Sequence, residues 1–216
     1  DVQFLDVLTG EIHGPRKSAE SCEFVVREFA ERGKLSLVSA SPRLFEVQEI
    51  AAEIVVSRIK NWLSSKTEKY DRVIIDCPPS ISSLSLSALK AADEILVPMV
   101  ADQFSLFGLP ILLESLDQYR RLLDINARIA GVVLSMFPPA SSNAGRQKAE
   151  LYKTKLEELC ATKTIRCLSS RISKASEYPA SFEQKCPLPF AEPKAKRLVN
   201  EIDALALELG LGGENI

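Results

Sequence analysis

The part of the sequence best suited to chemistry is residues 70–80, which read YDRVIIDCPPS. The continuous, β-branched run at residues 72–77 predicts a short strand buried on both faces of a parallel sheet. Asp76 near its end would then place a carboxylate at the carboxyl edge of the sheet, where α/β folds bind ligands. A carboxylate in this position can help to hold Mg²⁺ on nucleotide phosphates. The alternative is that Asp76 only caps a loop, since many strands end in aspartate.

The sequence gives little indication of a catalytic or metal site built from histidine or cysteine. His13 is the only histidine, and it lies in a polar, glycine-containing segment, so a Ser-His-Asp or Cys-His centre is not expected. The five cysteines are odd in number, scattered and free of C-x-x-C pairs, which argues against a disulfide framework, a zinc site and a bridging iron–sulfur cluster. They fit a reducing cytoplasm. The cysteines are Cys22, Cys77, Cys160, Cys167 and Cys186.

The composition is that of an ordinary globular chain, with 216 residues, 46% of them hydrophobic and 26% charged. The formal net charge of -2 creates no global attraction to nucleic acid or to an anionic membrane. Any DNA contact must therefore come from a local basic patch. No apolar run approaches the roughly 18–20 residues that span a bilayer, and the first residues do not read as a secretory signal.

Strand-like and helix-like segments alternate along the chain. Continuous apolar runs predict strands at residues 34–40, 72–77, 94–100, 128–137 and 164–168. Helical periodicity and composition predict helices at residues 44–63, 84–92, 106–123, 143–160 and 198–209. Pro110 is expected in the first turn of its helix, and Ser141, Ser142 and Asn143 are N-cap candidates. The alternation predicts one α/β domain over residues 1–216, with a mostly parallel sheet covered by helices on both faces.

The string IIDCPPS at residues 74–80 closely resembles a pattern of the ParA/MinD family of P-loop ATPases. In that family, apolar residues followed by D-C-P-P-S form the Walker-B strand. The resemblance continues in SLSALKAADEILVPM at residues 85–99 and in QFSLFGL at residues 103–109. It extends to FLDVLTG at 4–10, LSLVSASP at 35–42, GVVLSMF at 131–137 and RISKA at 171–175. The match runs almost from end to end and is closest to the Soj-like ParA partition proteins.

The resemblance implies ATP and Mg²⁺ as cofactors, with Asp76 as a catalytic residue that holds the metal through water. It also implies contacts to the nucleotide and, without sequence readout, to DNA. The implied nucleotide contacts are Asp76, Pro78, Pro79, Ser135, Met136, Phe137, Cys167 and Leu168. The implied DNA contacts are Arg171, Lys174, Lys194, Lys196 and Arg197, for which the alternative is an ordinary solvated surface.

Two departures from the family pattern concern the nucleotide. The sequence contains neither G-x-x-x-x-G-K-S/T nor the family's K-G-G-x-G-K-S/T variant, and residues 14–18, GPRKS, cannot form a nest of N–H groups around phosphates. Residues 167–169, CLS, replace the family's usual P-R-N near the adenine. We therefore expect an N-terminally truncated chain that lacks the P-loop strand and is inactive as an ATPase on its own.

The resemblance implies a partition ATPase that dimerises on ATP binding, binds nonspecific DNA and segregates plasmid or chromosome DNA. The implied partner is a ParB-type centromere-binding protein, and the implied location is the cytoplasm, on the nucleoid. Two alternatives stay open: a degenerate ParA-like binding or scaffold module without ATP hydrolysis, and a MinD-like positioning ATPase. Residues 200–216 contain no lysine or arginine, so the basic amphipathic helix of a membrane-cycling protein is not expected there.

A second group of cations is interpreted as a solvated helix face, because acidic residues are interleaved with them. The cations are Arg146, Lys148, Lys153 and Lys155, and the acidic residues are Glu150, Glu157 and Glu158.

Overall fold

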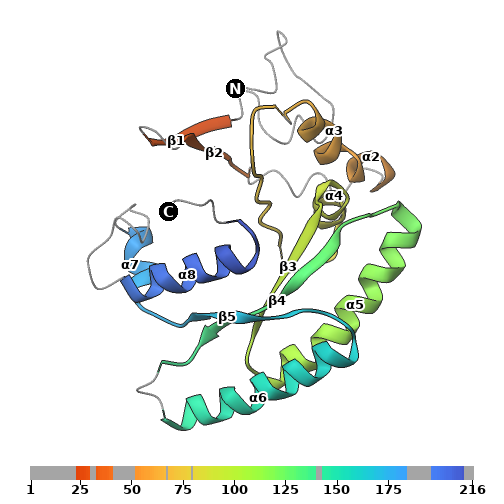
Figure 1. The fold of residues 1–216 in the computed structure, drawn as a ribbon. Helices are drawn as coiled ribbons and strands as arrows, with labels where there is room; N and C mark the ends of the chain where they lie inside the picture. The colour runs from red at the N-terminus through yellow and green to blue at the C-terminus, as the bar shows by residue number, and fades with distance from the viewer. Residues whose placement is uncertain are drawn as a thin grey trace. The chain divides into compact units, whose positions relative to one another are not determined.

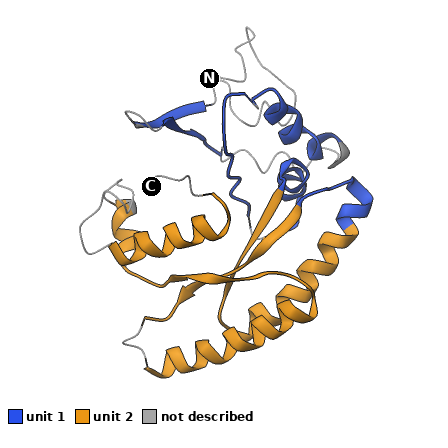
Figure 2. Cartoon of the chain, in the orientation of Figure 1, with its two compact units in different colours: residues 1–93, 119–127 blue, residues 94–118, 128–216 orange. Residues whose placement is uncertain are grey.

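The computed structural model describes residues 23–29, 33–40, 52–66, 68–78, 80–139, 143–183 and 196–211 (Figure 1). The chain divides into two compact units (Figure 2). Unit 1 comprises residues 1–93 and 119–127, and unit 2 comprises residues 94–118 and 128–216. Each unit has its own cluster of buried apolar side chains.

Unit 1 begins with an antiparallel hairpin of β1, Glu23–Phe29, and β2, Gly33–Val38. Gly33 has a φ of 91°, which glycine adopts at little steric cost. The strand predicted at residues 34–40 is therefore present, but it pairs with β1 and does not join the parallel sheet. Both strands expose apolar side chains, and each of the following is more than half exposed: Phe24, Val25, Val26, Leu35 and Leu37.

A buried carboxylate anchors β1 within unit 1. The Glu23 side chain is 5% exposed and lies 2.8 Å from Nζ of Lys66. Lys69 also pairs with it, and the Tyr70 hydroxyl donates a hydrogen bond to it at 2.6 Å. Burial raises the pKa of Glu23, but hydrogen bonds from these three partners outweigh burial and hold the pKa at about 2.

Three short helices pack together in unit 1: α2 at Ala52–Val56, α3 at Arg58–Ser64 and α4 at Ser83–Ala91. α4 confirms the helix predicted at residues 84–92. Of the single helix predicted over 44–63, residues 44–51 lie outside the described residues, and the described remainder is broken at Ser57, so a single continuous helix is wrong there. The buried Ser87 hydroxyl donates to the Val55 carbonyl at 2.9 Å and accepts from the Ile59 N–H at 3.5 Å. In a continuous helix the Ile59 N–H would donate to the Val55 carbonyl. The Ser87 hydroxyl binds both of these groups instead, which accounts for the break in the helix.

Residues 72–77 do not form the predicted strand. They have no strand assignment, and Ile74 is 89% exposed while Val73 is 51% exposed. A strand buried on both faces needs neighbours that take up its backbone N–H and C=O groups. No other strand in the described part of the chain pairs with these residues, so the prediction of a buried strand is wrong here.

Unit 2 is built on a parallel sheet in the order β3-β4-β5 (Figure 1). Its strands are β3 at Glu94–Val100, β4 at Arg128–Phe137 and β5 at Cys167–Ser173. The strands predicted at residues 94–100 and 128–137 are confirmed. The predicted α/β class, with a parallel sheet and packed helices, is also confirmed.

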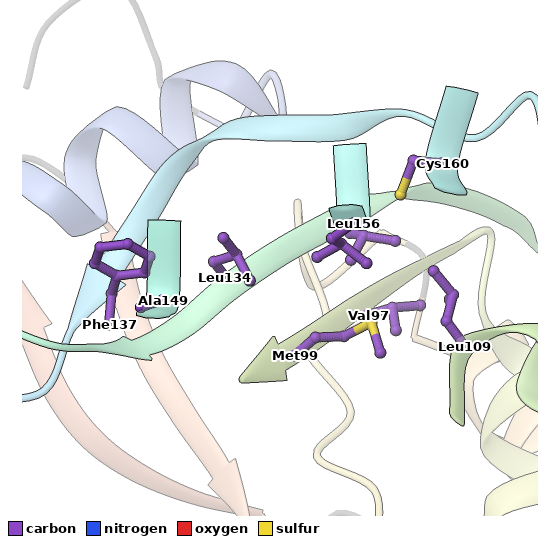
Figure 3. Close-up of a cluster of buried hydrophobic side chains, with 9 residues drawn as sticks. Val97, Met99, Leu109, Leu134, Phe137, Ala149, Leu156 and Cys160 are labelled. Carbon is purple, nitrogen blue, oxygen red and sulfur yellow. The ribbon is translucent and has the colours of Figure 1, made fainter. Parts of the chain in front are cut away.

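Two long helices pack on one face of this sheet: α5 at Gln103–Leu123, of which residues 119–123 belong to unit 1, and α6 at Asn143–Thr162. Figure 3 shows their buried side chains against those of the strands. The cluster contains Val97, Met99, Leu109, Val132, Leu134, Phe137, Ala149, Leu156 and Cys160. Burying a large apolar side chain contributes about 1.5–3 kcal/mol, so this cluster is the main apolar support for the strands that carry the candidate site.

The prediction that Pro110 lies in the first turn of its helix is wrong. α5 already begins at Gln103, because the Asp102 carboxylate caps it by accepting a hydrogen bond from the Ser105 N–H at 2.8 Å. Pro110 therefore lies inside the helix, where it lacks the N–H that would donate to the Leu106 carbonyl.

β5 begins and ends later than the strand predicted at residues 164–168. The end of α6 gives the reason. Thr164 has a φ of 56°, and the Ile165 N–H donates to the Cys160 carbonyl at 2.9 Å. With the bond from the Thr164 N–H to Ala161 at 3.1 Å, this is a Schellman cap, so these residues close the helix and do not start the strand.

The chain continues through α7, Glu177–Glu183, to the closing helix α8, Lys196–Glu208. α8 confirms the predicted last helix. Gly210, with a φ of 68°, follows it in the left-handed conformation that commonly ends a helix. Leu198, 1% exposed, anchors α8 against Ala175 and Tyr178. Among the described helices, none combines the length and the apolar character that crossing a bilayer requires.

Candidate functional site

Asp76 lies in the extended segment between α3 and α4, within unit 1. Its side chain is exposed, as are Cys77 and Pro78, while Pro79 lies outside the described residues. Desolvation of the thiol and the nearby Asp76 carboxylate both raise the pKa of Cys77, so this thiol is protonated at neutral pH. The Asp76 carboxylate is open to solvent and to a ligand, and it contributes little to packing.

The described residues do not by themselves complete a site for nucleotide and Mg²⁺. They contain no cluster of three or more His, Cys, Asp or Glu side chains able to hold a metal. The sequence also has no glycine-rich motif that would cradle phosphates. Asp76 can supply one carboxylate oxygen to a hydrated Mg²⁺, but the backbone N–H groups and the lysine that would hold the phosphates are not found among these residues.

The predicted nucleotide contacts at the end of β4 differ in exposure. Phe137 is 2% exposed and belongs to the apolar cluster of unit 2, whereas Met136 is 52% exposed. Met136 has a φ of 53°, a left-handed conformation that non-glycine residues rarely adopt. The register of β4 on β5 shifts between Leu134 and Phe137, and Ser135 is half-buried. Met136 is thus the most exposed of the three predicted residues.

The predicted contacts at the start of β5 lie elsewhere along the sheet. Cys167 is opposite Val132, whereas Ser173 is opposite Phe137. Leu168 is 5% exposed, and Cys167 packs against the apolar cluster. The two groups of predicted nucleotide contacts therefore lie near opposite ends of the β4–β5 pairing, and the structure does not bring them together.

Four of the predicted DNA-contacting residues form what we call the β5–α8 basic cluster: Arg171, Lys174, Lys196 and Arg197. Arg171 lies in β5, and the exposed Lys174 directly follows that strand. Lys196 and Arg197 are the first two residues of α8. A guanidinium N–H of Arg197 donates to the Ser173 hydroxyl at 2.9 Å, which ties the start of α8 to the end of β5. The start of α8, with Lys196 and Arg197, is thereby attached to the end of β5, next to Lys174. Lys194 lies outside the described residues.

Arg171 is held on two sides. Its guanidinium lies 4.6 Å from the centre of the Phe137 ring, in the range of a cation–π contact. One N–H group donates to a carboxylate oxygen of Glu150 on α6 at 3.2 Å. The same oxygen lies 3.8 Å from Nε of Arg146. Arg146 and Glu150, interpreted from the sequence as part of a solvated helix face, therefore belong to the surroundings of Arg171.

Two carboxylates of α8, neither of them predicted from the sequence, hold the backbone of β5. Glu201 accepts hydrogen bonds from the N–H and the hydroxyl of Ser173, each at 2.8 Å. Glu208 accepts from the N–H groups of Ser169 and Ser170, each at 2.8 Å. Burial raises the pKa of Glu208, but the hydrogen bonds from these two serines outweigh it and hold the pKa at about 2. The seven-residue spacing of the two glutamates, two turns of one helix, was the available signal.

A family model for an AAA domain matches residues 18–129, just over half of the chain. The chromosome partitioning protein ParA of Myxococcus xanthus is 31% identical over 137 residues, which make up 61% of this chain and 48% of that protein. The sporulation initiation inhibitor protein Soj of Bacillus subtilis is 30% identical over 156 residues, which make up 72% of this chain and 58% of that protein. The chain belongs to the ParA/MinD family of P-loop ATPases. It spans about half the length of the curated relatives that it matches.

Solved structures agree on the fold. The McdA–ATP complex from Cyanothece superposes with a TM-score of 0.78 at 18% identity, over 98% of this chain and 76% of that one. A putative plasmid partition protein from Borrelia burgdorferi, bound to AMPPNP, gives a TM-score of 0.67 at 19% identity, over 95% of this chain and 74% of that one. At 18–19% identity this similarity establishes the α/β fold. The role of each residue must be argued from its position and contacts in this structure.

Proposed function

We propose that the protein is a ParA-like partition ATPase that, with ATP and Mg²⁺ bound, dimerises and holds DNA through the β5–α8 basic cluster. The observation that carries this proposal is the contact of Arg197, at the start of α8, with Ser173 at the end of β5, the strand that contains Arg171 and is directly followed by Lys174. Cations at a strand end and at the start of a helix can each meet a phosphate and release counterions. The positive end of the α8 dipole favours phosphate at the same place. Such contacts carry no sequence information, as nonspecific binding requires.

The nucleotide part of the proposal rests on family membership and on Asp76. Two structural neighbours were solved with ATP or AMPPNP, and we infer that this protein binds ATP with Mg²⁺ as well. Asp76 would hold the metal through water, and its exposed carboxylate is free to do so. Phosphate binding is not assigned to any of the described residues. When bound, Mg²⁺ would neutralise phosphate charge.

The biological setting that we propose is DNA segregation. Relatives named as chromosome partitioning proteins support this setting. The proposed partner is a ParB-type centromere-binding protein that stimulates hydrolysis and so releases the DNA, and the proposed location is on the nucleoid.

One other function has an observation in its favour. The sequence lacks a phosphate-binding motif, as a ParA-like binding or scaffold module without ATP hydrolysis also would. The two candidates differ in turnover: the ATPase requires Mg²⁺-dependent release of phosphate by the intact protein, and the binding module shows none.

The test of the DNA contact is Arg171→Ala in the intact protein, with duplex binding measured across a salt series. If Arg171 neutralises one phosphate, the slope of log K against log[salt] should become shallower by about 0.9. Affinity for two unrelated duplexes should fall about equally. Lys153→Ala is the matched control, because it also removes one cation but takes it from an α6 pair with Glu157 at 2.6 Å. Equal affinity and slope for wild type and Arg171→Ala would remove Arg171 from the DNA contact.

A further inference from the structure

Glu150 lies between two guanidinium groups from different elements. Its carboxylate oxygen is 3.2 Å from an Nη of Arg171 on β5 and 3.8 Å from Nε of Arg146 on α6. The side chains of Glu150 and Arg171 are 42% and 36% exposed, so an ion from solvent can reach the pair. An anionic oxygen shared by two arginines is also the arrangement in which proteins bind phosphate.

Glu201, the other carboxylate at the basic cluster, has a different role. It accepts hydrogen bonds from the N–H and the hydroxyl of Ser173 in addition to its bond with Arg197 at 2.6 Å. Removing it would leave a backbone group of β5 without its partner, at a cost in folding. The contacts found for the Glu150 carboxylate in the described residues are the two arginines alone. It is therefore the carboxylate that can be exchanged without loosening the strand.

We propose that Glu150 is an internal competitor for DNA: its carboxylate occupies the place of a phosphate between Arg146 and Arg171 and must give way when DNA binds. This proposal rests on the DNA-binding function proposed above, and it adds a residue that sets the DNA affinity of the basic cluster. The Phe137 ring, 4.6 Å from the Arg171 guanidinium, keeps the arginine in place while the anions exchange. A surface ion pair is weak enough for such an exchange. The arrangement lowers DNA affinity, so that the protein can release DNA.

The proposal predicts tighter binding when the charge of Glu150 is removed. Glu150→Gln keeps the size of the side chain and leaves the Arg146 guanidinium, in addition to that of Arg171, free to neutralise a phosphate. Removing a like charge about 4 Å from a phosphate in water should raise duplex affinity roughly fivefold. One additional neutralised phosphate should make the slope of log K against log[salt] steeper by about 0.9.

A matched control lies on the same helix. Glu157→Gln makes the same change in net charge, but Glu157 pairs with Lys153 and does not contact Arg171. Its affinity and its slope should stay close to those of wild type. In the Glu150→Gln background, Arg146→Gln should return the slope to the wild-type value, because it removes the second guanidinium of the pair.

The experiment is duplex binding by the intact protein with ATP and Mg²⁺, across a salt series, with thermal unfolding to verify folding. Glu150→Ala serves as the second variant should Glu150→Gln unfold. Tighter binding and a steeper slope for Glu150→Gln, and not for Glu157→Gln, support the competitor. If Arg171→Ala weakens binding while Glu150→Gln matches Glu157→Gln, the competitor is wrong and the DNA contact stands. If Arg171→Ala changes nothing, the proposed DNA contact itself fails.

Discussion

Asp76 allows the ATPase proposal to be tested at a single residue. Because its side chain is exposed, its removal can change ATP turnover without lowering the free energy of unfolding. In the intact protein, Asp76→Ala should abolish Mg²⁺-dependent ATP turnover, since it removes the carboxylate proposed to hold the hydrated metal. The free energy of unfolding should change by less than about 0.5 kcal/mol, as for an ordinary surface substitution. Phosphate release and thermal unfolding measure the two quantities. Unchanged turnover in the variant would show that the carboxylate is not at the metal.

Gly131 allows β4 and β5 to pack closely, because it has no side chain. A Cβ atom there would lie 2.8 Å from two side-chain carbons of Leu168 and 3.2 Å from the Arg166 carbonyl oxygen. Gly131→Ala should therefore destabilise the protein by about 1–3 kcal/mol, as overpacking does. Gly108 is the matched control: it lies inside α5, and a Cβ atom there would meet nothing within 4 Å. Gly108→Ala should stabilise by about 0.5–1 kcal/mol. Denaturant unfolding distinguishes them, and equal effects would contradict the packing argument.

At the level of single residues, the sequence indicated the cations of the basic cluster but not the acids that hold them. Family resemblance pointed to Arg171 and Arg197, and both lie in the cluster. Their partner Glu150 gave no separate signal, and the only signal for Glu201 was its seven-residue spacing from Glu208. A glutamate four residues after an arginine, as in Arg146 and Glu150, is equally common on a solvated helix, so only the fold shows that Glu150 also reaches β5.

At the level of elements, the sequence was most informative where local signals decide the structure. The strands at residues 94–100 and 128–137 are continuous apolar runs and are confirmed. The start of β5 was misplaced because Thr164, a residue type seldom used for a left-handed cap, closes α6. Residues 72–77 have strand composition, but a strand also requires a neighbour, and composition says nothing about whether one is present.

The attachment of α8 to β5 should depend on pH through Glu208. Its pKa of about 2 in the folded chain lies below the ordinary value of 4.5. Because the folded pKa is depressed, the stabilisation is fully present above pH 4.5 and is lost as pH falls toward 2. Glu208→Gln should cost about 1–3 kcal/mol at pH 7, since it removes the charge that accepts two backbone N–H groups. The loss of stability between pH 5 and pH 2 should also be smaller in the variant.

Thermal unfolding at a series of pH values measures this prediction. Glu158→Gln is the control, because Glu158 is an exposed residue of α6 and its removal should leave the acid-induced loss of stability as in wild type. Parallel pH profiles for Glu208→Gln and wild type would contradict the role of Glu208 as the ionised acceptor at the β5 backbone.

At the level of the whole molecule, a chain of net charge -2 has its described candidate DNA contacts in β5, directly after it and at the start of α8, all within unit 2. The candidate metal ligand Asp76 belongs to unit 1. The proposed ParA-like function would couple these two parts, because nucleotide binding would have to change the affinity for DNA. Coupling between two sites typically amounts to about 1–3 kcal/mol, or about 5- to 150-fold in affinity.

The most direct test of the account is therefore the nucleotide dependence of DNA binding by the intact protein. Duplex affinity would be measured at one fixed salt concentration with ATP and Mg²⁺, with ADP and Mg²⁺, and without nucleotide. The account predicts binding about 5- to 150-fold tighter with ATP and Mg²⁺ than in the other two conditions. The same affinity in all three conditions would contradict the claim that this protein is a ParA-like ATPase whose hold on DNA is controlled by ATP.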